Sequence, residues 1–282
     1  MEAEATKILE QQRDTWNAFS GGWKKWDNWV MKYIEPLGTE IINHLNLKAT
    51  DRVLDVATGT GEPGLSIAKI VSNGKVVGTD ISEKMIEIAE ENAEKRNVRN
   101  YKAIVADVCD LPFEDNSFDA ISCRFGFMFF PDMSLAAKEM ARVLHVGGTF
   151  ATSVWGTPEK NFWVTSIMGP VSKNMNIAPP PPGSPGMFRC TDKNMMIDLF
   201  KKAGFSEVNL KEVNTSGNVE SFEHFWEYMN DVAAPVASAM SKADDKMKLK
   251  IKSEVAESFM KKFARDKDIS MEYQAYLIYG TK

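Results

Sequence analysis

The chain has 282 residues, 44% of them hydrophobic and 26% charged, which suits one α/β domain with insertions and a sizeable core. Its formal net charge is −5, and the charged residues are not gathered in blocks of one sign, which argues against a general nucleic-acid-binding surface. The three cysteines and three histidines are too scattered to form a disulfide framework or a metal-ligand set.

The first segment of the chain, MEAEATKILEQQRD, is acidic and polar where a secretory signal would need a basic start and an apolar stretch. No apolar run approaches the roughly 20 residues needed to cross a bilayer. These features predict a soluble, cytoplasmic protein with no membrane span.

Aromatic residues follow at helical spacing in TWNAFSGGWKKWDNWV. Trp16, Phe19, Trp23, Trp26 and Trp29 are separated by 3, 4, 3 and 3 residues, which predicts a helix with one aromatic face. That face either packs against the domain or closes over a bound ligand, where it could also attract a cation. We expect residues 1–48 to form an N-terminal helical cover.

Short apolar runs then alternate with helical patterns, which is typical of a parallel sheet with helices on both faces. Leu65 opens one expected helix, Ser82 is the expected N-cap of a second, and a third extends from Leu135 until Gly147 and Gly148 stop it. The expected strands are 53–57, 76–80, 101–107, 118–125 and 149–155.

The alternation stops after Trp155. Residues 156–190 are rich in proline and show no clear element, so we expect a lid and acceptor region there. Beyond it, Thr191 is the expected cap of a helix that ends at Gly204. The remaining expected elements are the strand EVNLKEV, the helix FEHFWEYM, a lysine-rich helix from about Ser241 to Ala264, and the closing strand MEYQAYLIYG.

The glycine-rich stretch DVATGTGEPG, residues 55–64, satisfies the dinucleotide fingerprint G-x-G-x-x-G, which would indicate a nicotinamide or flavin cofactor. Asp55 in front of the loop argues against a pyrophosphate, because like charges repel in a poorly solvated crevice. It would instead attract an ammonium group, such as that of S-adenosylmethionine, which carries no phosphate.

Two further aspartates end the next expected strands. Asp80 could hold the ribose hydroxyls of either ligand, and Asp107 could accept a hydrogen bond from the exocyclic amine of adenine. Each strand-end aspartate could also be only a helix cap or turn former. All three together with a glycine loop favour S-adenosylmethionine.

Four stretches resemble the class I S-adenosylmethionine-dependent methyltransferases, and within them the branch of ubiquinone and menaquinone biosynthesis C-methyltransferases. They are VLDVATGTGEPG, VVGTDISEKMIEIAEENA, VADVCDLPFEDNSFDAISCRFGFMFFPD and EMARVLHVGG. The resemblance covers residues 50–155 closely. It implies a Rossmann-like, seven-stranded, mostly parallel sheet whose antiparallel strand is MEYQAYLIYG, within a methyltransferase domain at 49–282.

The resemblance also implies a role for each residue of the cofactor site. The residues so assigned are Asp55, Ala57, Gly59 and Gly61 around the methionine moiety, Thr60 in the same cofactor-binding loop, Asp80, Ile81 and Met85 around ribose and adenine, Asp107 and Val108 at the adenine edge, and Cys123, Arg124 and Phe125 near the reactive methyl group.

The acceptor side departs from the quinone enzymes. Those enzymes have an Arg-Asn pair where this chain has FMFF at 127–130, an acidic strand end where it has SVWGTP, and a lysine where it has His145. The aromatic residues beyond the fourth and fifth expected strands favour a small, apolar or aromatic acceptor. The candidate acceptor-site residues are Trp23, Trp26, Phe127, Trp155, Trp163 and Phe188.

No catalytic residue is assigned, because positioning alone can supply much of the rate of methyl transfer. His224 could act as a general base, but a histidine on an aromatic-rich helix is more often structural. Two alternatives stay open. One is an NAD(P)-dependent oxidoreductase, although the Tyr-x-x-x-Lys pair of short-chain dehydrogenases is absent, and the other is a non-catalytic adenosyl-ligand binding protein.

Overall fold

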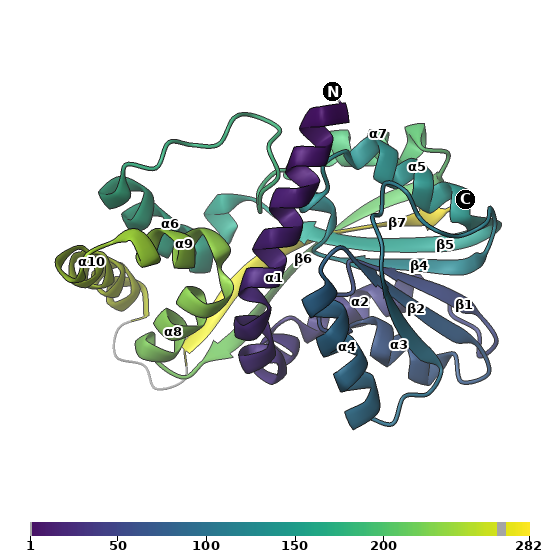
Figure 1. Cartoon of the computed structure of the whole chain (residues 1–282), viewed down its shortest axis with the longest axis horizontal. Helices are drawn as coiled ribbons and strands as arrows, with labels where there is room; N and C mark the ends of the chain where they lie inside the picture. The colour runs from purple at the N-terminus through teal and green to yellow at the C-terminus, as the bar shows by residue number, and fades with distance from the viewer. Residues whose placement is uncertain (1, 264–268) are drawn as a thin grey trace.

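The computed structural model describes residues 2–263 and 269–282 and contains a seven-stranded sheet (Figure 1). The strand order is β3-β2-β1-β4-β5-β7-β6, and β7 is antiparallel to both of its neighbours. This confirms the Rossmann-like α/β prediction and the antiparallel role of the last strand. The strands are β1 Arg52–Val56, β2 Lys75–Asp80, β3 Tyr101–Val105, β4 Phe118–Arg124, β5 Leu144–Trp155, β6 Ser206–Val219 and β7 Ile269–Thr281.

Helices cover both faces of the sheet, as expected for parallel strands with continuous apolar runs. Figure 1 shows α2, α3 and α4 on one face and α5 and α7 on the other. The helices are α1 Glu2–Tyr33, α2 Glu35–His44, α3 Gly64–Ile70, α4 Glu83–Lys95, α5 Met133–Val143, α6 Phe162–Met175, α7 Lys193–Lys202, α8 Phe222–Val232, α9 Ala234–Lys242 and α10 Asp245–Phe263, with short 3-10 turns at Phe127–Phe129 and Pro158–Lys160.

Several predicted boundaries are corrected. Ser82 does cap α4, since its side chain accepts from the Met85 amide, but the cap of α7 is Asp192 and not Thr191. The glycine pair at 147–148 does not stop α5. The helix ends at Val143, and β5 runs through both glycines because their backbones pair with Lys282.

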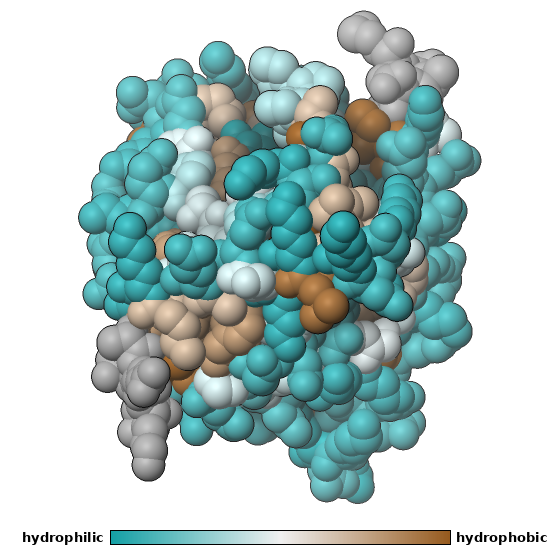
Figure 2. All heavy atoms as spheres, turned by 90° about the vertical axis from the view of Figure 1, so that its left-hand side faces the viewer, coloured by the Kyte–Doolittle hydropathy of each residue, from teal (hydrophilic) through white to brown (hydrophobic). Residues whose placement is uncertain are grey.

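The lid region also holds more structure than its sequence indicated. Residues 162–175 form α6, although Pro170 lies inside it, while 176–190 have no regular element. The lysine-rich stretch forms two helices, α9 and α10, and the expected end at Ala264 lies outside the described residues. These two helices and α8 gather at one end of the sheet (Figure 1). The surface of the molecule on that side is mostly hydrophilic, with small hydrophobic patches (Figure 2).

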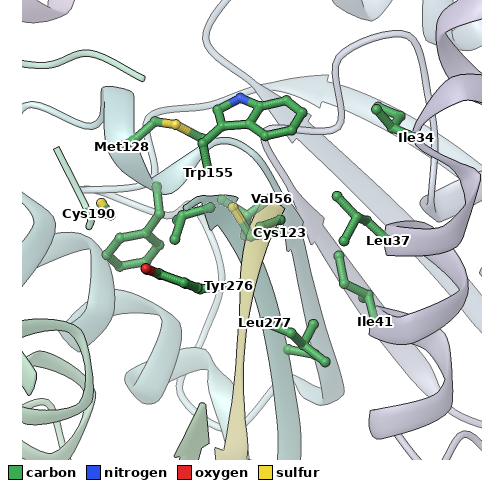
Figure 3. Close-up of a cluster of buried hydrophobic side chains, with 14 of the residues drawn as sticks. Ile34, Leu37, Ile41, Val56, Cys123, Met128, Trp155, Cys190, Tyr276 and Leu277 are labelled. Atoms are coloured by element: carbon green, nitrogen blue, oxygen red, sulfur yellow. The ribbon is translucent and has the colours of Figure 1, made fainter. Parts of the chain in front are cut away.

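The core beneath the N-terminal segment explains how that segment is anchored. Leu37 and Ile41 of α2 are fully buried and point toward Val56 of β1 and Cys123 of β4 (Figure 3). Each such side chain contributes roughly 1.5–3 kcal/mol. Helix α1 precedes α2 and contacts α4 and α8, so it crosses the strand ends (Figure 1). Among the described residues, no helix combines the length and apolar character needed to span a membrane.

Candidate active site

A cavity with about 970 Å³ of empty space, part of it open to solvent, lies where β1, β2 and β4 end and α1 crosses them. Ligands of open α/β sheets bind at this edge. Ten of the residues assigned to the cofactor line the cavity: Ala57, Gly59, Thr60, Asp80, Ile81, Met85, Asp107, Val108, Arg124 and Phe125.

The loop after β1 presents its backbone to the cavity. Gly59 has a φ of +55°, and a side chain there would meet nothing within 4 Å, so the glycine leaves room for a ligand. Gly61 has a φ of +114°, and a Cβ atom there would come within 2.7 Å of Leu65. Glycine is therefore required at 61 by the loop itself, and Gly61 does not line the cavity.

Asp55 lies behind the loop and not on the cavity wall. Its carboxylate is fully buried and accepts hydrogen bonds from the hydroxyls of Ser122 and Thr58, both at 2.6 Å, and from the Gly64 amide at 3.1 Å. Burial raises its pKa to about 6, although these bonds oppose the shift. Asp55 therefore holds the loop in place. Its carboxylate could attract the ammonium group of a ligand only from behind the loop backbone.

Asp80 lies on the cavity wall at the end of β2. Its two oxygens accept from the amides of Gly59 and Ser82, each at 3.0 Å, which joins the loop to the start of α4. Burial raises the pKa of Asp80 to about 6. Each carboxylate oxygen can accept a further hydrogen bond, so the side chain can still receive ligand hydroxyls.

The far end of the cavity is formed by Asp107 and Val108. Asp107 was expected to end the third strand, but β3 ends at Val105 and Asp107 follows in a turn, where it accepts from the Cys109 amide at 2.9 Å. Cys123 is fully buried in β4 and does not reach the cavity. In the part of the chain that the structure describes, no group of three His, Cys, Asp or Glu side chains could hold a metal ion.

The predicted acceptor residues are mostly not in the cavity wall. Trp23 lines the cavity, whereas Trp26 turns away and donates to Asp231 at 2.8 Å. Trp155 stacks behind the cavity residue Phe125, with ring centroids 3.9 Å apart. Phe127 and Trp163 are buried in the core, and Phe188 packs against it.

The cover contributes wall residues that the sequence analysis did not assign. Helix α1 supplies Leu9, Gln12 and Met31 beside Trp16 of the predicted aromatic face, and Ile34 follows. A signal existed in the sequence, since Leu9 and Gln12 share a helical face with Trp16 and Trp23. The other unassigned wall residues are Val56, Thr58, Glu62, Thr79, Ala106, Gly126, Phe129, Phe130 and Pro131.

Polar contacts hold this cover in place. Asp27 of α1 accepts from the Thr60 hydroxyl and, at 3.3 Å, from Asn92 of α4. Nearer the start of α1, Asn17 accepts from the Ser82 hydroxyl at 2.6 Å. The cover is therefore joined to both the glycine loop and the helix that follows Asp80.

The sheet order, the glycine loop and the strand-end aspartates define a Rossmann-like fold of the methyltransferase type. Residues 47–176 match the family model of a methyltransferase domain. The fold and this match support a class I S-adenosylmethionine-dependent methyltransferase, with S-adenosylmethionine as its cofactor.

Known relatives agree with this class. A demethylmenaquinone methyltransferase of Staphylococcus saprophyticus is 29% identical over 215 residues, 72% of this chain and 91% of its own. That of Staphylococcus carnosus is 38% identical over 109 residues, which span 38% of this chain and only 44% of the relative. A phosphoethanolamine N-methyltransferase of Haemonchus contortus, solved with S-adenosylhomocysteine, shares the fold, with a TM-score of 0.58 at 19% identity over 96% of this chain and 59% of its own.

Proposed function

We propose that the protein transfers a methyl group from S-adenosylmethionine to a small, apolar or aromatic acceptor. One observation carries the proposal: the cavity joins a glycine loop and Asp80 to an apolar wall that includes Trp16 and Trp23 of the cover and Phe129 after β4. The likeness to demethylmenaquinone methyltransferases supports an apolar ring as the acceptor. The boundaries of the cover at 1–48 and of the catalytic domain at 49–282 are part of the same proposal.

The residues present suit the cofactor. Gly59 leaves open space at the loop, and Asp80 retains acceptor capacity for ribose hydroxyls. Ile81, Met85 and Val108 supply apolar wall beside it. When bound, S-adenosylmethionine supplies an electrophilic methyl group on its sulfonium. The electron pair of the carbon–sulfur bond that breaks stays on sulfur.

The protein's own contribution is positioning and exclusion of water. Helix α1 closes the cavity from above, while Phe125 and Phe129 flank the space at the end of β4. Holding two reactants in line can supply about 7–11 kcal/mol of the barrier. Of the acidic groups that line the cavity, Glu62 is paired with Arg96, and Asp80 and Asp107 bind backbone amides. We therefore assign no general base.

Product formation tests the proposal. The purified protein is incubated with methyl-labelled S-adenosylmethionine and a panel of naphthols, reduced naphthoquinones, phenols and, as polar controls, small amino alcohols. Labelled product with an aromatic acceptor supports the proposal, and preferential methylation of the polar controls contradicts it. Tight cofactor binding with no product from any acceptor would favour the non-catalytic alternative. A cytoplasmic location is also a proposal, which cell fractionation would test.

A further inference from the structure

Arg124, the last residue of β4, brings a cation to the cavity wall. Its guanidinium donates to the sulfur of Met31 at 2.8 Å. Within residues 2–263 and 269–282, no carboxylate forms an ion pair with it. A thioether is a weak acceptor and the guanidinium has five N–H donors, so most of its hydrogen-bonding capacity is available to a ligand.

The carboxylates near Arg124 bind other side chains and do not pair with its guanidinium. Asp55 accepts from Ser122 and Thr58, Glu62 pairs with Arg96, and Asp27 accepts from Thr60. They attract the guanidinium through space, whereas burial lowers the pKa of Arg124. A part-buried cation without a paired anion is costly, and a carboxylate that binds it in fork geometry would offset that cost.

The position of Arg124 indicates which part of a ligand would meet it. Strand β4 pairs with β1, with Cys123 opposite Val56, so Arg124 lies beside the start of the glycine loop. Asp80 ends β2 and Asp107 follows β3, and both strands lie on the other side of β1. An adenosyl ligand with its ribose at Asp80 and its adenine near Asp107 therefore extends its amino-acid end toward Arg124.

We propose that Arg124 binds the carboxylate of the amino-acid end of S-adenosylmethionine and so sets the position of the sulfonium along the cavity. This inference rests on the proposed function. Arg124 is a positioning residue, since it grips the end of the cofactor that does not react. The protein should accordingly discriminate against adenosyl ligands that lack a carboxylate.

Binding calorimetry with three ligands tests the assignment. S-adenosylhomocysteine has the complete amino-acid end, decarboxylated S-adenosylmethionine lacks only the carboxylate relative to S-adenosylmethionine, and 5′-methylthioadenosine lacks the whole end. Arg124→Met should weaken binding of S-adenosylhomocysteine about tenfold or more, the scale of a charge-assisted hydrogen bond. It should leave binding of 5′-methylthioadenosine unchanged within about twofold and abolish the preference for S-adenosylmethionine over its decarboxylated form. Arg124→Lys should restore part of the loss.

The control is Arg99→Met, which removes an exposed arginine remote from the cavity, and thermal unfolding checks that each variant is folded. Equal losses for S-adenosylhomocysteine and 5′-methylthioadenosine would overturn the proposal. So would an unchanged affinity for both with a raised KM for the acceptor, because Arg124 would then hold an anionic group of the acceptor. If the wild-type protein bound none of the three ligands, the proposed function itself would fail.

Discussion

Asp27 in the N-terminal helix and Thr60 in the glycine-rich loop are joined by a hydrogen bond, although they are 33 positions apart in the sequence. Asn92 donates to the same carboxylate and also to the Thr60 carbonyl, at 2.9 Å. Asp27, Thr60 and Asn92 are all buried. The cover and the cofactor loop are therefore held together by one polar cluster. A change in the cover should alter the loop, and a change in the loop should alter the cover.

Asp27→Ala should loosen the cover and weaken cofactor binding. Removing the carboxylate leaves the Thr60 hydroxyl without its acceptor and leaves Asn92 with only its bond to the Thr60 carbonyl, at a cost of about 1–3 kcal/mol. We expect faster backbone hydrogen exchange over residues 9–31 and weaker binding of S-adenosylhomocysteine. Asp14→Ala, an exposed position on the same helix, is the control. Wild-type exchange and affinity in the Asp27 variant would show that the cluster does not hold the cover.

Asp80→Ala should weaken S-adenosylhomocysteine binding by about 1–3 kcal/mol, because hydrogen bonds to a charged group are lost and the Gly59 amide loses its acceptor. Calorimetry measures the change. Asp110→Ala, which removes an exposed carboxylate outside the cavity, should bind like the wild type. An unchanged affinity in the Asp80 variant would remove the ribose assignment.

Asp55 should give the protein a distinctive dependence of stability on pH. Its pKa is about 6 in the folded chain against an ordinary 3.8. Between these values the folded state binds more protons than the unfolded state, so this group's contribution to stability is complete below pH 4 and falls as the pH rises to 6. The destabilisation caused by Asp55→Asn should therefore be smaller at pH 7 than at pH 4, by about 1–3 kcal/mol.

Urea unfolding of the wild type and of Asp55→Asn across this pH range measures whether the difference in their free energies of unfolding shrinks as the pH rises. Other carboxylates contribute equally to both proteins. Asp110→Asn should show no such dependence. A destabilisation that grows as the pH rises would mean that the Asp55 carboxylate is stabilised in its charged form.

The sequence predicted the sheet and the cofactor edge because their signals are local. Apolar runs of strand length, a glycine loop and an aspartate after each of three runs identify the edge of the sheet without knowledge of packing. Burial depth is different. Asp55 and Asp80 look alike in sequence, yet one faces inward to Ser122 and Thr58 and the other faces the cavity, and only the packed fold distinguishes them.

The aromatic residues show the same limit. Trp23 and Trp26 are three residues apart on α1, but only Trp23 reaches the cavity. Its indole nitrogen is buried and has no hydrogen-bond partner among the described residues. Which face of a long aromatic helix meets the ligand depends on α8, whose Asp231 binds Trp26, and no local pattern reveals that contact.

Trp23 and Trp26 should therefore differ when changed. Trp23→Phe reduces the ring area on the cavity wall and removes a buried N–H that has no partner, so we expect weaker binding of ligand in the cavity with little loss of stability. Trp26→Phe loses the bond to Asp231 and should lower the free energy of unfolding by about 1 kcal/mol with ligand affinity unchanged. Calorimetry and urea unfolding of both variants measure the contrast. The reverse pattern would assign the cavity face to Trp26.

His224→Ala should leave turnover nearly intact. Its ring packs edge-on against Trp26 and Trp29, with centroids 5.0 and 4.8 Å away, and it does not line the cavity. We expect a loss of stability of about 1 kcal/mol from the lost ring contacts. Single-turnover rates with saturating cofactor check the chemistry. A hundredfold fall in rate in a folded variant would restore His224 as a general base.

The most direct test of the central claim is calorimetric titration of the wild-type protein with S-adenosylhomocysteine, with NADH and NADPH titrated in parallel. The geometry of the glycine loop and Asp80 predicts saturable binding of S-adenosylhomocysteine alone. Binding of a nicotinamide cofactor alone would contradict the account and identify the loop as a dinucleotide site.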